Sequence, residues 1–148
     1  MGSEMCIRDR TNRPAKKNFW QKRTVSGAGE EYLCRWGHVA GLVNQQTVFV
    51  FGGINDEGYA VRSVYNYDFV ENEIYDLTEN GTPIPTRIGC GLLPIGNGML
   101  MLYGGEDPQG RGSFSDLWHI KVHPGTRDVH YKEAKYKEDH EHYIMGWR

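Results

Sequence analysis

The chain has 148 residues and a formal net charge of −2. Its 19 glycines make up nearly twice the average share, which is roughly 7%. A charge this close to zero excludes the overall basic character that is typical of proteins that bind nucleic acid or anionic membranes. No apolar run approaches the roughly 18 residues of a membrane span, and the first residues lack the apolar block of a signal peptide, so we expect a cytoplasmic protein.

The start of the chain is predicted to be an assembly artefact. Residues 5–10 are MCIRDR, which the codons ATG TGT ATA AGA GAC AGx encode, and that string resembles an adapter used in sequencing libraries. We therefore exclude residues 1–10 from the predicted fold, as a tag would be excluded. This leaves Cys34 and Cys90, whose separation predicts neither a zinc site nor a disulfide framework. The chain is then expected to be a fragment of a longer protein.

A shift of 52 residues superimposes two halves of the chain, which predicts a repeat protein. The apolar block at 48–51 falls on the block at 100–103 at this shift. A period near 50 with short β-rich segments favours β-propeller blades over helical repeats. The identical pairs are Arg35 with Arg87, Gly37 with Gly89, Gly52 with Gly104, Gly53 with Gly105, and Ser63 with Ser115.

Each period is predicted to contain four strands, because turn residues separate short segments rich in β-branched and aromatic residues. The first blade, 34–85, is expected to contain strands at 34–43, 47–51, 62–69 and 73–77. The second blade, 86–136, is expected to contain strands at 87–94, 99–103, 115–122 and 129–136. Residues 11–33 are predicted to end a preceding blade, with its last strand beginning at Trp20, and residues 137–148 to form a linker and open a following blade.

The repeated residues resemble the kelch repeat. The first unit carries RWGH at 35–38, an apolar strand ending in two glycines, then YNYD at 65–68 with Asn72, Ile74 and Leu77. The second unit carries RIGC at 87–90, its own glycine pair, and DLWHIKV at 116–122. The resemblance implies an all-β fold made of four-stranded antiparallel blades in a propeller, commonly with six or seven blades.

The resemblance also implies structural roles for the repeated residues. We expect His38 to be buried and hydrogen-bonded, and the glycine pairs to let aromatic side chains pack against the backbone where a strand turns. With only two blades, Val48, Val50, Leu100 and Leu102 are expected to be poorly covered. The predicted structural residues are Arg35, Gly37, His38, Gly52, Gly53, Tyr67, Arg87, Gly89, Gly104, Gly105 and Trp118.

No catalytic motif of a known type is found in the sequence. There is no GxSxG, HExxH, P-loop or GxGxxG, and the tail EDHEHY at 138–143, with His140 and His142, is predicted to be a solvated linker. We therefore expect no cofactor and no metal.

The loops carry the predicted binding function, because loops on a rigid scaffold are where binding residues concentrate. The favoured function is a non-catalytic scaffold that binds another protein or peptide, not nucleic acid or membrane. It is expected to bind through the loops between strands two and three and between blades, which emerge at the same end of the propeller. The alternative is part of a propeller enzyme, such as a galactose-oxidase-like copper oxidase or a sugar epimerase, whose active residues lie in missing blades. The predicted partner-binding residues are Asn55, Asp56, Glu57, Tyr59, Arg62, Asp107, Gln109 and Arg111.

Overall fold

The computed structural model describes residues 20–25 and 33–135. The predicted artefact at 1–10, the predicted blade opening at 137–148 and most of 11–33 lie outside these residues. Among the described residues, no helix has both the length and the apolar character needed to cross a membrane.

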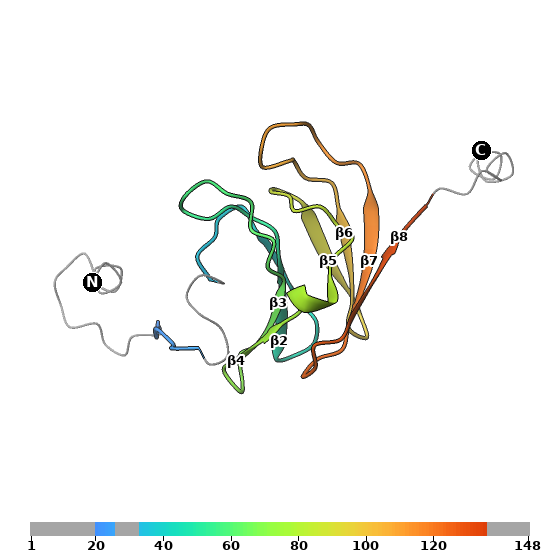
Figure 1. Ribbon diagram of the computed structural model, residues 1–148. Helices are drawn as coiled ribbons and strands as arrows, with labels where there is room; N and C mark the ends of the chain where they lie inside the picture. The colour runs from blue at the N-terminus through green and yellow to red at the C-terminus, as the bar shows by residue number, and fades with distance from the viewer. Residues whose placement is uncertain (1–19, 26–32, 136–148) are drawn as a thin grey trace, which may run out of the picture.

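Within the described ranges, eight strands form two antiparallel four-stranded sheets, and each sheet follows the order of the chain (Figure 1). A short 3-10 helix, Thr78–Asn80, begins the join between them. The first sheet contains β1 (Val39–Leu42), β2 (Thr47–Phe51), β3 (Tyr65–Asp68) and β4 (Glu73–Asp76). The second contains β5 (Gly91–Gly96), β6 (Met99–Tyr103), β7 (Leu117–Val122) and β8 (Val129–Glu133).

The predicted all-β class is confirmed, and the bounds of β2 and β6 agree with the prediction. The first strand of each sheet starts later than expected. Before β1 and β5 the chain makes only isolated bridges, Trp36 with Ile54 and Ile88 with Glu106. The strand predicted to begin at Trp20 is not seen in residues 20–25, which have no regular secondary structure.

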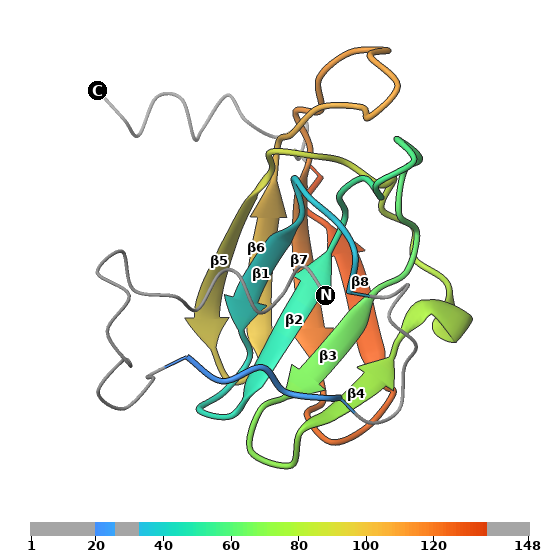
Figure 2. The same cartoon turned by 90° about the vertical axis from the view of Figure 1, so that its left-hand side faces the viewer.

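The two sheets stack face to face, as Figure 2 shows with the first sheet in front of the second. Alternation along β7 directs Trp118, Ile120 and Val122 toward the first sheet, where they share one core with Phe49 and Phe51. Burial of this apolar surface is the main favourable contribution to the contact between the sheets.

The packing corrects one expectation about the apolar strands. Leu100 and Leu102 were expected to be poorly covered, yet both are fully buried because their side chains face the first sheet. Val50 is also buried, in a smaller cluster on the opposite face of the first sheet, against which Val25 and Val48 pack. Residues 20–25 therefore lie on that side of the first sheet, where Figures 1 and 2 draw them in blue.

The first glycine pair lies where the two sheets meet. Gly52 has a φ of +75°, and a Cβ placed on it would lie 2.4 Å from the carbonyl oxygen of Arg87. The next amide, that of Gly53, donates to the same oxygen at 3.1 Å. The expectation of an aromatic side chain against this glycine is wrong, because the atom that excludes a side chain is the backbone oxygen of Arg87 in the join.

Replacing Gly52 by alanine should lower the free energy of unfolding by about 3 kcal/mol or more, because backbone strain and a clash with a carbonyl oxygen add together. Gly58→Ala is the matched control, since Gly58 has a φ of +87° but nothing within 4 Å of a Cβ. The control should cost about 1 kcal/mol, from strain alone. Urea unfolding of both variants measures the difference, and equal losses would contradict a close contact between the sheets at Gly52.

Candidate functional site

The longest connections between strands of the same sheet lie at the same end of the molecule. They are residues 52–64, between β2 and β3, and residues 104–116, between β6 and β7. Both rise at the top of Figure 1, whereas the β3–β4 and β7–β8 hairpins are at the bottom. The antiparallel strand order of each sheet produces this arrangement, so the loops are presented together by a rigid scaffold.

The tips of the two loops share an internal structure. The Oδ1 atom of Asn55 accepts from the amide of Glu57 at 3.1 Å, and Oδ1 of Asp107 accepts from that of Gln109 at 2.8 Å. Two glycines also donate to these residues: the amide of Gly58 to the carbonyl of Asn55 and the amide of Gly110 to that of Asp107. Asn55 and Asp107 thus shape their own loops, as such side chains commonly do in turns.

A pocket of about 340 Å³ lies between these loops and the join from the first sheet to the second. It brings together four of the predicted binding residues: Arg62, Asp107, Gln109 and Arg111. The other lining residues are Ala60, Thr82, Ile84, Pro85, Thr86 and Pro108. The remaining predicted binding residues, Asn55, Asp56, Glu57 and Tyr59, do not line it.

The pocket has a cationic side. Arg62 is exposed, and Arg111 donates from Nε to Oδ2 of Asp107 at 3.0 Å while 72% of its side chain stays exposed. Two guanidinium groups against one carboxylate leave an excess of one positive charge. A planar guanidinium binds carboxylate or phosphate oxygens well, so the pocket favours an anionic group.

Arg87 fixes the wall of the pocket from within. Its side chain has no exposed surface, yet it is fully engaged: Nη1 and Nη2 donate to Asp116 at 2.5 and 3.0 Å, and Nη1 also donates to the carbonyl of Gly104 at 3.0 Å. Its Nε donates to the carbonyl of Pro85 at 3.2 Å, and its guanidinium lies 3.9 Å from the ring centre of Phe114. One side chain therefore ties the join, which lines the pocket, to both ends of the second loop.

The ion pair with Arg87 lowers the pKa of Asp116. Hydrogen bonds from Arg87, and a further one from Nε1 of Trp118 at 2.7 Å, hold the pKa of the Asp116 carboxyl below its ordinary value. In the first repeat, burial lowers the pKa of Arg35, whose guanidinium lies 5.1 Å from the ring centre of Tyr65. The same burial effect raises the pKa of the Tyr65 phenol.

The structure places the other predicted structural residues as follows. The hydroxyl of Tyr67 donates to Oδ1 of Asn72 at 2.9 Å, and Trp118 belongs to the core between the sheets. The amide of Gly89 donates to the carbonyl of Gly37, its equivalent one repeat earlier, at 3.3 Å. The expectation of a buried His38 is wrong, because its side chain is exposed.

The join was predicted to be one of the binding loops, but none of its residues was among the predicted partner-binding residues. Thr82, Ile84, Pro85 and Thr86 line it, and the hydroxyl of Thr86 donates to the carbonyl of Val61 at 3.2 Å. A signal was present, since the join was expected at the same end as the loops and contains two prolines that limit its conformations.

Comparison with models of protein families and with curated proteins finds no match for this chain. Function is therefore argued from the site, because one fold serves many functions.

Replacing Asp116 by asparagine should lower the free energy of unfolding at pH 7 by about 3 kcal/mol, because the buried Arg87 loses its counter-charge. A carboxyl whose pKa is lowered on folding stabilises the protein above its unfolded pKa and loses that effect as pH falls through the folded pKa. The stability difference between wild type and variant should thus be constant above about pH 5 and shrink below about pH 4.

Chemical denaturation between pH 2 and 8 measures this difference, with Asp56→Asn in the exposed first loop as the control. A difference that stays constant down to pH 2 would contradict a stabilising Arg87–Asp116 ion pair.

Proposed function

We propose that this chain is part of a cytoplasmic kelch-type β-propeller and that it acts as a non-catalytic scaffold. It binds another protein through the pocket between the two loops, and the ligand is an acidic peptide segment of that protein. The observation that carries the proposal is the cationic pocket between rigidly held loops at one end of two stacked, equivalent sheets.

The equivalence of the two sheets supports the assignment as successive blades. Both have the same strand order, and each of the equivalent arginines, Arg35 and Arg87, donates to the carbonyl of the first glycine in its own glycine pair. Recurring contacts at the spacing of one repeat are what a stacked repeat architecture requires.

The exposed outer face of the second sheet is evidence for a neighbouring blade. Leu93 and Tyr103 are each 54% exposed, whereas Leu102 on the opposite face is fully buried. Gly104 has a φ of +65°, and a Cβ placed on it would meet only one atom, at 3.8 Å. This leaves room for a carbonyl such as the one that its equivalent, Gly52, receives from the next sheet. We therefore assign this face to a contact with a further blade.

The state of the cysteines supports a cytoplasmic location. Cys34 and Cys90 are free thiols in the structure, as is usual in the reducing cytoplasm. Burial raises the pKa of the Cys90 thiol, which keeps it in the less reactive protonated form.

The chemistry of the pocket supports peptide binding. Guanidinium groups of Arg62 and Arg111 suit carboxylates, while Pro85 and Pro108 offer an apolar wall for the rest of a peptide. Because the loops are braced internally and by Arg87, little conformational entropy is lost when a ligand is bound.

The charge-reversed double variant Arg62→Glu and Arg111→Glu should bind a fluorescein-labelled acidic peptide at least tenfold more weakly than wild type. Arg127→Glu is the matched control, since it changes charge in the β7–β8 hairpin at the other end of the molecule. Fluorescence polarisation at two salt concentrations measures the affinities, with a peptide carrying Gln in place of Glu as the neutral probe.

Three results would count against this site. They are equal binding of the neutral peptide, an equal loss in Arg127→Glu, and an equal loss in Tyr59→Ala, because Tyr59 is exposed on the first loop outside the pocket.

A further inference from the structure

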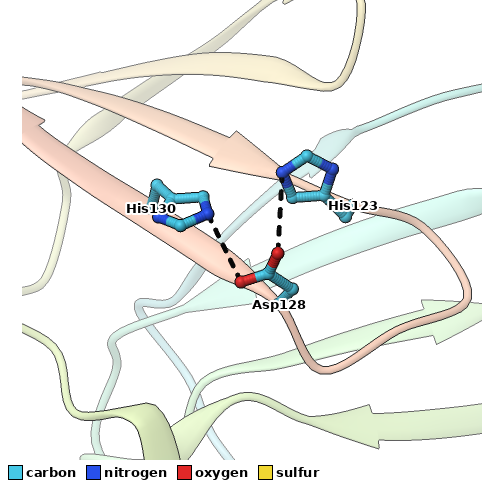
Figure 3. A group of neighbouring side chains, drawn as sticks. All are labelled: His123, Asp128 and His130. Carbon is cyan, nitrogen blue, oxygen red and sulfur yellow. Dashed lines mark ion pairs between the residues drawn. The ribbon is translucent and has the colours of Figure 1, made fainter.

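The β7–β8 hairpin carries a group of potential metal ligands at the end of the molecule opposite the pocket. His123 follows β7, His130 is on β8, and Asp128 lies in the turn between them (Figure 3). We infer that these three side chains bind a divalent transition-metal ion of the zinc type. No metal was expected from the sequence.

Strand alternation places all three ligands on one face. Val122 and Val129 form a register pair and are buried in the core between the sheets. Residues one position away from them therefore point to the other side of the sheet. His123 and Asp128 are opposite each other there, and His130 is the diagonal neighbour of His123, a position from which long side chains meet.

The ligand atoms already converge. Nε2 of His123 lies 3.8 Å from Oδ2 of Asp128, and Nε2 of His130 lies 3.4 Å from Oδ1 of the same carboxylate. One ligand atom from each residue lies within 4.8 Å of the others. Tetrahedral zinc with bonds of about 2.1 Å holds its ligand atoms roughly 3.4 Å apart. Small side-chain rotations thus suffice to complete the site.

The turn is held by its own hydrogen bonds. The amide of Thr126 donates to the carbonyl of His123 at 3.2 Å, across a Pro-Gly pair in which Gly125 has a φ of +73°. The amide of His123 donates to the carbonyl of Asp128 at 3.1 Å, and the amide of Asp128 donates to the hydroxyl of Thr126 at 3.1 Å. Such a fixed turn lowers the entropy lost when its side chains bind an ion.

Two neighbouring cations are directed elsewhere. Lys121 is the register partner of His130, and its ammonium group donates a hydrogen bond to the carbonyl of Asn97. Arg127, next to Asp128, lies 3.9 Å from the carboxylate of Glu79. With neutral imidazoles, the ligand set carries a charge of −1 from Asp128, which favours a cation.

The donor atoms select the kind of metal. Two imidazole nitrogens and one carboxylate oxygen suit zinc, cobalt or nickel, whereas calcium and magnesium prefer sites made of oxygen alone. Three protein ligands leave a fourth position of the tetrahedron for water or for a ligand from a partner.

Titration of the full chain, freed of metal by a chelator, with zinc chloride in a calorimeter tests the site. We expect one ion bound per chain, and cobalt chloride should give the visible absorption of tetrahedral coordination. His123→Ala, His130→Ala and Asp128→Asn should each weaken zinc binding at least tenfold. These side chains are exposed by 45%, 67% and 58%, so the variants should fold as wild type does, which circular dichroism checks.

Two controls separate this site from other histidines. His38→Ala removes an exposed histidine just before β1 and should leave the affinity within twofold of wild type. The double variant His140→Ala and His142→Ala, outside the described residues, should do the same. Zinc should also raise the melting temperature of wild type but not that of His123→Ala, because only the former binds the ion in its folded state.

Absence of zinc binding to the wild-type chain would overturn the inference. So would binding that survives the hairpin substitutions, or binding that is lost only when His140 and His142 are replaced.

Discussion

A single buried residue, Arg87, connects the parts of this molecule. Its backbone carbonyl accepts from Gly53 at the start of the first loop, and its guanidinium binds Asp116 and Gly104 of the second loop and Pro85 of the join. Removing a guanidinium from water is costly unless its donors are satisfied. The fully buried group is therefore stable only when join, second loop and sheet contact are all in place, which makes their geometry interdependent.

The glycine pairs follow from this constraint. The carbonyl of Arg87 approaches the first sheet so closely that the residue at 52 cannot carry a Cβ, and the positive φ there directs the next amide to the same oxygen. Gly53 must also lack a side chain, because a Cβ placed on it would lie 2.8 Å from the carbonyl oxygen of Trp36 in the same repeat. Each pair thus combines a contact inside a sheet with room for a contact between sheets.

These contacts explain what the sequence predicts well. A contact that recurs once per repeat leaves identical residues at a fixed spacing, and from that spacing β2, β6 and the common end of the two loops follow. The pocket does not follow, because it lies between non-equivalent segments: a loop of one repeat, a loop of the next, and the join. His38 was misplaced for a related reason. Its burial was inferred from its place at the start of a predicted strand, whereas exposure depends on packing that the repeat pattern does not encode.

The hairpins at the other end show how the two repeats diverge. In the first repeat, the β3–β4 turn is shaped by Asp68, which accepts from the amides of Val70 and Glu71 at 2.9 Å. In the second repeat, a Pro-Gly pair forms the turn instead, and the carboxylate of Asp128 faces two imidazoles. The spacing His-x4-Asp-x-His was visible in the sequence, but its meaning required the register of β7 with β8. A shift of one residue would turn His130 toward the core. Because Val122 and Val129 are both buried, that register is fixed, and the same apolar packing that holds the sheets together sets the positions of the ligands.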